Sequence, residues 1–293
     1  MFRIILLLPL FLLTSCHVKS SIPTTTDTSQ VTTSIKEMVD QKEGFFNFTW
    51  DENAGTVMLE IDKFDTEFLY VNSLPAGMGS NDIGLDRGQL GATRIVKFVR
   101  VGNKVLMMQP NYNYRAVSDN PAESESVEQA FAQSVIWGFK VDSEKGNSVI
   151  VNATDFLLRD AHQVTARLER KNEGSYKVDK TRSAIYPEMC RNFPKNTEFE
   201  ATITFVGKAK GRYLRSVTPS AEALTLRMHH SFVELPDANY EPRVFDPRSG
   251  FNSIAYQDYA TPIDQSLVKK FIRRHRLEKK DPTLTSMLNS NNN

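Results

Sequence analysis

Alternating apolar and polar residues, the pattern of strands with one buried face, recur along most of this chain. The clearest pair is residues 93–101 and 104–109, which flank Gly102-Asn103, a sequence typical of two-residue hairpin turns. Residues 75–91 hold five glycines and are predicted to form a long loop between strands. Further strands are expected at residues 45–50, 56–61, 68–74, 135–141, 148–152, 198–206 and 224–235.

A helical spacing of apolar residues predicts a helix over residues 154–170. Shorter helices are expected at residues 34–42, 123–132 and 262–274; Ser34 and Glu37 would form a capping box for the first. The fold class predicted is α+β and β-dominated, with many short antiparallel strands and two or three helices. The strands would form a bent sheet or a sandwich.

The N-terminus has the pattern of an export signal. Arg3 precedes an apolar run over residues 4–13, too short for a bilayer, which takes about 20 residues. Leu13-Thr14-Ser15-Cys16 resembles the bacterial lipobox, so residues 1–15 are interpreted as a signal peptide and Cys16 as the lipid-bearing residue. The alternative is an ordinary cleaved signal with a chance cysteine. Residues 16–33 would be a flexible tether, and the protein would lie in the cell envelope, at the outer membrane or periplasmic face.

Composition narrows the function classes. The formal net charge is +1, which gives no field attracting nucleic acid. Of two cysteines, lipidated Cys16 would leave Cys190 alone, so no intramolecular disulfide is expected. A hydrophobic content of 40% is enough for a core that stabilises an exported domain without one.

Catalytic motifs are missing from the sequence. No H-E-x-x-H occurs, and His229 and His230 are adjacent in an expected strand, so they would face opposite sides and not share a metal. Cys190 precedes Arg191, which would lower the thiol pKa, but no histidine partner is apparent. The glycines of residues 77–88 lack the Lys-Ser/Thr of a phosphate loop. We therefore predict no catalytic residue, no metal and no cofactor.

A family resemblance rests on many short motifs in one order. Residues 83–89, 229–236 and 246–250 resemble signatures of the N-terminal domain of unknown function in bacterial zinc-dependent metalloproteases of the met-zincin type. The resemblance covers about residues 36–282, and we place the domain at 34–282. Further matching segments are residues 109–111, 114–116, 134–139, 155–160, 174–176, 182–183, 193–198 and 274–282.

The resemblance implies which domain accompanies this one in the family. In that family it precedes a peptidase domain, which we expect to be missing from this chain; residues 283–293 resemble a disordered tail. We therefore expect a non-catalytic, lipid-anchored envelope protein, a truncated or split member of the family. Its partners would be the membrane, through the lipid, and a zinc peptidase domain in cis or in trans.

Two charged loops are candidates for the surface that faces the peptidase. They carry Asp86 and Arg87, and Arg243, Asp246 and Arg248. The alternative is that these Asp–Arg pairs only tie their loops together.

Two other functions compete with the accessory domain. The protein would be a stand-alone peptide- or glycan-binding lipoprotein if aromatic side chains lined a groove instead of packing in the core. It would be an enzyme if polar groups converged around His162, His229 or Cys190. The tyrosines that would line such a groove are Tyr112, Tyr114, Tyr256 and Tyr259.

Overall fold

The computed structural model describes residues 39–275. The predictions for residues 1–15, Cys16, residues 16–33 and residues 283–293 lie outside this range. Within residues 39–275, no helix is both long enough and apolar enough to cross a membrane.

Sixteen strands and four α-helices make up the described residues. The α-helices are α2 (Pro121–Ala130), α3 (Thr154–Leu157), α4 (Val164–Arg170) and α5 (Arg212–Val217), and three 3-10 turns lie at Lys180–Arg182, Pro187–Met189 and Pro247–Ser249. The first eight strands are β1 (Val39–Lys42), β2 (Phe48–Asp51), β3 (Thr56–Ile61), β4 (Glu67–Ala76), β5 (Gln89–Val101), β6 (Lys104–Gln109), β7 (Tyr114–Arg115) and β8 (Ser134–Lys145). The others are β9 (Ser148–Asn152), β10 (Gly174–Val178), β11 (Ala184–Ile185), β12 (Arg191–Phe193), β13 (Asn196–Ala209), β14 (Ala223–Glu234), β15 (Ser253–Asp258) and β16 (Val268–Ile272).

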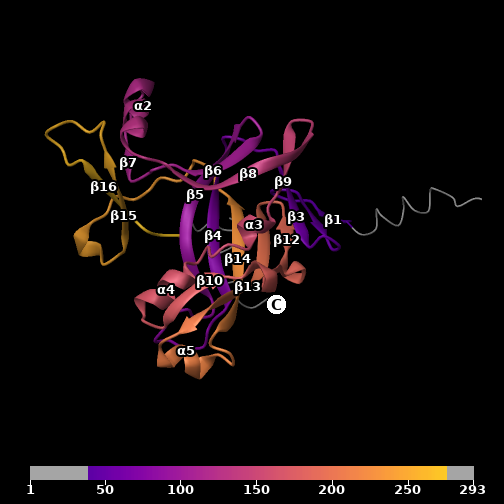
Figure 1. Cartoon of the computed structure of the whole chain (residues 1–293). Coiled ribbons are helices and arrows are strands. Elements are labelled where there is room, and N and C mark those ends of the chain that lie inside the picture. Colours follow the sequence, from indigo (N-terminus) through magenta and orange to yellow (C-terminus); the bar gives the residue numbers. More distant parts are fainter. Residues whose placement is uncertain (1–38, 276–293) are drawn as a thin grey trace, which may run out of the picture. The chain divides into compact units, whose positions relative to one another are not determined.

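Thirteen strands form one antiparallel sheet (Figure 1). Its order is β1-β2-β3-β9-β8-β6-β5-β4-β14-β13-β10, with β11 and β12 also paired to β13. The fold is therefore β-dominated, as predicted. The order is not sequential, because β4 pairs with β14 as well as with its hairpin neighbour β5.

Several strands are longer than expected, although most strands of the described residues are short, as predicted. β5, β8, β13 and β14 contain 13, 12, 14 and 12 residues. Register shifts interrupt the pairing between Val71 and Ser73 and between Arg227 and His229. Such bulges bend a strand without ending it, so a break in the alternating pattern need not mark a strand end.

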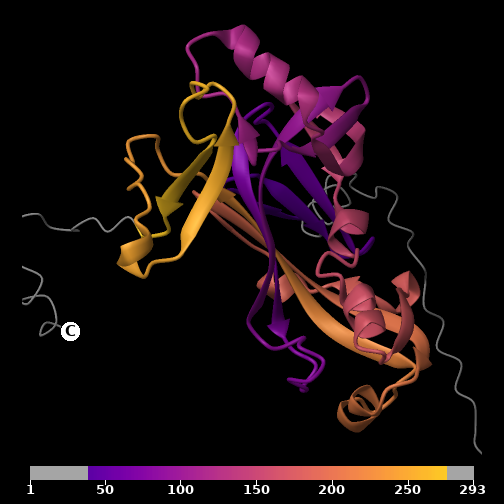
Figure 2. The ribbon, with the colours of Figure 1, turned by 90° about the vertical axis from the view of Figure 1, so that its left-hand side faces the viewer.

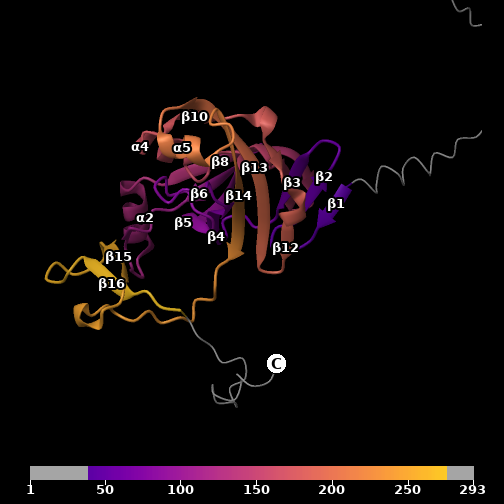
Figure 3. The ribbon, with the colours of Figure 1, turned by 90° about the horizontal axis from the view of Figure 1, so that it is seen from below.

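Hydrogen bonds join the two sides of the bent sheet and leave it nearly closed. The backbone N–H of Phe45 donates to the carbonyl of Phe193 at 2.8 Å. The Asn192 amide donates to the carbonyls of Lys42 and Phe46 at 3.0 and 2.8 Å. Figure 3 shows β1–β3 and β12 next to one another. These bonds satisfy backbone groups that would otherwise remain at open sheet edges.

Aromatic side chains fill the core on the inner face of the sheet. The rings of Phe46, Phe68, Phe98 and Phe232 are at most 1% exposed. Their centroids lie 5.0 to 6.3 Å apart, mostly in edge-to-face arrangements. They come from three strands and the turn before β2, so the core depends on the strand order.

The expected helix over residues 154–170 is two helices, α3 and α4. The Asp160 carboxylate accepts hydrogen bonds from the N–H groups of Val164 and Thr165, at 2.8 and 2.9 Å, and so begins a new helix. Gln163, directly before α4, has φ +57°, a left-handed conformation that a continuous helix over residues 154–170 would not contain. Helix α2 confirms the helix expected at 123–132, and α5 was not expected, so the described residues contain more helices than predicted.

Two other expected helices are wrong where the structure describes them. Residues 268–272 form β16, which pairs with β15 and, through it, with the parallel β7. Figure 2 shows this small sheet in yellow and orange beside the main one. At the N-terminal side, residues 39–42 form β1 and pair with β2. In both places backbone pairing with a distant or neighbouring strand overrides a local helical pattern.

Candidate functional site

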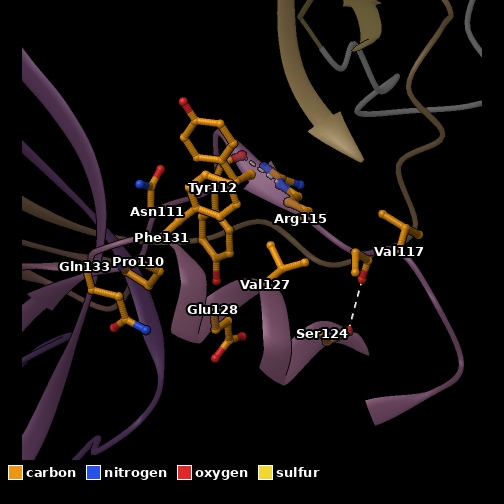
Figure 4. A pocket seen from close by; sticks show the side chains of 12 residues that line it. Pro110, Asn111, Tyr112, Arg115, Val117, Ser124, Val127, Glu128, Phe131 and Gln133 are labelled. Carbon is orange, nitrogen blue, oxygen red and sulfur yellow. Dashed lines mark hydrogen bonds between the residues drawn. The ribbon is translucent and has the colours of Figure 1, made fainter. Parts of the chain in front are cut away.

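A pocket of about 190 Å³ opens between the segment after β6, strand β7 and α2 (Figure 4). Most of its wall is apolar or aromatic, and α2, which buries none of its residues, closes one side. The Ser124 hydroxyl donates to the Ala116 carbonyl at 3.0 Å and so ties α2 to the segment after β7. The lining residues are Pro110, Asn111, Tyr112, Tyr114, Arg115, Ala116, Val117, Ser124, Val127, Glu128, Phe131 and Gln133.

Three stacked or tilted rings line and adjoin this pocket. Tyr114 and Phe131 lie parallel, with centroids 3.8 Å apart and an interplanar angle of 2°. Tyr259, which is 46% exposed, lies 5.3 Å from the Phe131 ring and 6.4 Å from the Tyr114 ring. Apolar rings held partly in solvent by one another form a preorganised contact surface for a ligand.

Arg115 links the pocket to the small sheet. Its guanidinium lies 4.8 Å from the centroid of Tyr112 and 4.4 Å from that of Tyr256, and its Nε donates to the Tyr112 carbonyl at 3.0 Å. Tyr256 in turn stacks on Phe271 at 6.0 Å. Cation–π contacts of this kind fix a long side chain in one orientation.

One carboxylate lies in the pocket wall, and a second contacts a wall residue. Glu128 lines it, and Glu67 accepts a hydrogen bond from the Tyr112 hydroxyl. Burial raises the pKa of Glu67 above its ordinary value, against the opposing charges of Lys97 and Arg115. The pocket thus combines aromatic faces, a fixed cation and a carboxylate in its wall. Such groups can contact a ligand through apolar surface, charge and hydrogen bonds.

The four tyrosines singled out in the sequence come together here. Tyr112 and Tyr114 line the pocket, and Tyr259 and Tyr256 contact its lining through Phe131 and Arg115. None of the four is buried in the core. The sequence did not point to Glu128 of α2 or to Phe131 directly after it, because neither belongs to a motif and both come close to β7 only through the folding of α2 against it.

A second polar cluster lies on the inner face of the main sheet. The Nε2 of His230 is 3.1 Å from the carbonyl of Leu157, which can only accept, so Nε2 carries the proton. The Tyr70 hydroxyl therefore donates to His230 Nδ1 at 2.9 Å, and its oxygen accepts from Arg159 Nη2 at 2.9 Å. Complete burial, with the nearby charge of Arg159, lowers the pKa of His230 to about 3.

His229 faces the other side of β14, which confirms the prediction that the two histidines point apart. Its Nε2 lies 2.7 Å from Glu198 and its Nδ1 lies 3.4 Å from Glu200. Burial alone would lower the pKa of His229, but the hydrogen bonds and charges of the two glutamates outweigh burial and raise it. Arg227 also pairs with Glu200 at 3.0 Å, so the two carboxylates of this cluster have cationic partners within it.

His162 is separated from His229 by the sheet. Its Nδ1 accepts a hydrogen bond from Asn72 on the inner face at 3.0 Å, and its Nε2 lies 3.3 Å from Gln89. Burial lowers its pKa. Over residues 39–275, no three or more His, Cys, Asp or Glu side chains are arranged to hold a metal ion.

Cys190 is buried, and the expectation that Arg191 lowers its pKa is wrong. Burial raises the pKa of the thiol to about 11. The Sγ lies 3.5 Å from the carbonyl of Tyr186, while the Arg191 guanidinium extends to the Met189 sulfur at 3.9 Å. Burial, together with the charges of Glu200 and Glu188, outweighs the opposing charge of Lys42 and so decides the thiol pKa.

We predict that Cys190 in the folded protein reacts slowly with a disulfide reagent at pH 8. A thiol of pKa near 11 is about a hundredfold less ionised there than an ordinary cysteine, and burial slows the reaction further. The measurement is the rate of thiol labelling in a Cys16→Ser protein, with the same protein in denaturant as control. Equal rates in the two conditions would contradict the burial of this residue.

The two charged loops occupy different places. The segment of Asp86 and Arg87 closes on β4, with Gly88 N–H donating to the Leu74 carbonyl at 2.7 Å. Asp246 and Arg248 form a two-bond ion pair at 2.6 and 3.0 Å, which also caps a 3-10 turn. Their segment runs along β16, where the N–H of Ile272 donates to the Arg243 carbonyl at 2.8 Å. The second loop therefore belongs to the small sheet that supplies Tyr256.

Fold and pocket together define a β-dominated protein with a nearly closed antiparallel sheet and an aromatic pocket beside a small second sheet. The chain belongs to the family described as a domain of unknown function (DUF5117), which matches residues 88–280. No curated protein and no solved structure matches it. Strand β4, before the matched segment, lies between β5 and β14, so the folded sheet extends N-terminal to the match.

Proposed function

We propose that this protein is a non-catalytic, lipid-anchored domain of the cell envelope that binds a polypeptide segment of a partner in its aromatic pocket. The observation that carries the proposal is the pair of stacked rings, Tyr114 and Phe131, in the wall of a space of about 190 Å³, with Tyr259 packed against Phe131. A space of this size accepts a side chain, and Glu128 in its wall favours a basic or amide-bearing neighbour.

The nature of the partner rests on the sequence resemblance. The motifs at residues 83–89, 229–236 and 246–250 support an accessory domain that supports or positions a zinc peptidase, in cis or in trans. The lipobox-like Leu13-Thr14-Ser15-Cys16 supports attachment to the membrane by lipid. The predicted docking residues Arg243, Asp246 and Arg248 lie along the small sheet, whose strand β15 carries Tyr256 and ends directly before Tyr259.

A glycan ligand is the second candidate, because aromatic residues also bind sugars. A sugar needs a free aromatic face, and the parallel contact of Tyr114 with Phe131 at 3.8 Å covers one face of each ring. The exposed Tyr259 offers the clearest remaining face. The peptide is therefore the better-supported ligand.

We expect Tyr114→Ala to weaken binding to a zinc-peptidase domain from a full-length relative by about tenfold or more, as for a central aromatic contact. The measurement is an equilibrium titration of the immobilised peptidase domain with wild type and variant. Tyr240→Ala serves as the matched control, because Tyr240 is not part of the pocket wall and should leave affinity unchanged.

Charge reversal tests the loops in the same titration. If both loops face the peptidase, Arg248→Glu and Arg87→Glu should each weaken binding. Unchanged affinity in all of these variants, including Tyr114→Ala, would reject the peptidase as the pocket's partner. Saturable binding of a chitin oligosaccharide, lost in Tyr259→Ala, would instead support the glycan.

A further inference from the structure

The inner polar cluster holds two half-buried arginines that lack an acidic partner. Arg159 follows α3, and Arg94 lies on β5 directly opposite Tyr70. None of the ion pairs formed among residues 39–275 includes either arginine. The adjacent carboxylate, Asp160, is occupied by the N–H groups that begin α4.

Arg159 is held in place by aromatic rings. Its guanidinium carbon lies 4.6 Å from the centroid of Phe156, 5.8 Å from that of Tyr70 and 5.9 Å from that of Trp137. One nitrogen, Nη2, donates to the Tyr70 hydroxyl, while the buried Nε has no hydrogen-bond partner. A buried donor without an acceptor costs stability, so its retention suggests that an acceptor from a ligand completes it.

The surrounding groups provide no negative charge. Tyr70 and His230 are neutral. The Tyr70 hydroxyl donates its hydrogen bond to His230, and His230 donates to the carbonyl of Leu157. The pKa of Arg94 is lowered by burial and also by the charge of Arg159, so the two cations repel one another. A bound anion would offset that repulsion.

A further buried polar residue lies on β4. Asn72 is fully buried, and its amide nitrogen donates to His162 while its Oδ1 has no partner. Asn72 lies two residues after Tyr70 on the same buried face of β4, so its unpartnered Oδ1 is a second, independent sign of a site for a polar ligand on this face.

We propose that Arg94 and Arg159 bind a carboxylate group of a ligand at the inner face of the sheet. A planar carboxylate matches the two-pronged donor edge of a guanidinium better than any other common anion of its size. The carboxylate has two sources, a chain terminus or an acidic side chain. This site is separate from the aromatic pocket, and neither proposal depends on the other.

Trp137 provides a built-in reporter, because the sequence contains two tryptophans and Trp50→Phe leaves only this one. The experiment titrates the full chain carrying Trp50→Phe with N-acetylglycine, which has a terminal carboxylate, and with N-acetylglutamic acid α-amide, which has a side-chain carboxylate. Sodium chloride at matched ionic strength is the control. We expect a saturable fluorescence change with a millimolar midpoint for at least one of the two carboxylates.

Arginine variants in the same background give the decisive comparison. Arg94→Gln and Arg159→Gln should each raise the midpoint about tenfold or more, whereas the exposed Arg170→Gln should leave it unchanged. Arg94→Gln keeps the Tyr70–Arg159 hydrogen bond, so it tests the site even if Arg159→Gln fails to fold. No saturable change with either carboxylate, equal midpoints in Arg94→Gln and wild type, or tighter binding of inorganic phosphate would overturn the proposal.

Discussion

Replacing Phe232 by alanine is expected to lower the free energy of unfolding by about 3–5 kcal/mol, the usual cost of emptying a large buried aromatic site. The ring is 1% exposed. Its centroid lies between 5.4 and 6.3 Å from those of six other rings, so the cavity could not collapse without moving several strands. The six neighbours are Phe46, Phe68, Tyr70, Phe98, Phe156 and Phe199.

Equilibrium unfolding in urea measures this effect. Phe251→Ala is the control, because Phe251 is 57% exposed and its loss should change the unfolding free energy by about 0.5 kcal/mol or less. A domain has only about 5–15 kcal/mol of stability, so Phe232→Ala would leave the protein marginal. Similar effects of the two substitutions would show that the Phe232 ring is not part of a packed core.

Acidification should destabilise the protein by about 2 kcal/mol between pH 7 and pH 5, through His230. The pKa of His230 is about 3 when folded and 6.5 in the reference state, so the unfolded chain binds the proton more readily. This contribution to stability is complete above pH 6.5 and is lost as pH falls from 6.5 towards 3. His162, whose pKa burial also lowers, acts in the same direction.

His229 changes stability in the opposite direction and in another pH window. Its raised pKa means that its contribution is complete below pH 6.5 and is lost as pH rises through the folded value. The unfolding free energy should therefore pass through a maximum near pH 6.5. Urea unfolding at several pH values measures the curve, and His229→Gln should remove only the loss on the alkaline side.

Histidine NMR resonances identify the group responsible for the loss of stability at acidic pH. The His230 resonance should show no titration down to about pH 4 in the folded protein. The His162→Gln variant should still lose most of the same unfolding free energy on acidification. A His230 resonance that titrates near pH 6.5 would contradict both its burial and the cause assigned to the pH dependence.

The outward half of the candidate site was partly visible in the sequence. Tyrosines at positions 112, 114, 256 and 259 were named as the residues that would line a groove if they did not pack in the core, and they gather at the pocket. The opposite facing of His229 and His230 followed from the two-residue period of a strand. Phe131, Glu128 and the Tyr70–His230–Arg159 chain were missed, because their members come from elements far apart in sequence and share no motif.

Local pattern by itself determined the β-dominated class, the hairpin of β5 and β6 around Gly102-Asn103, and helix α2 with its Asn120 cap. These features depend on residues within a few positions of one another, so their physical causes are all present in a short segment. Tertiary structure alone decided that residues 268–272 are a strand and that β4 lies between β5 and β14. Strand pairing and core packing join residues distant in sequence, and their energies exceed local preferences that differ by only fractions of a kcal/mol.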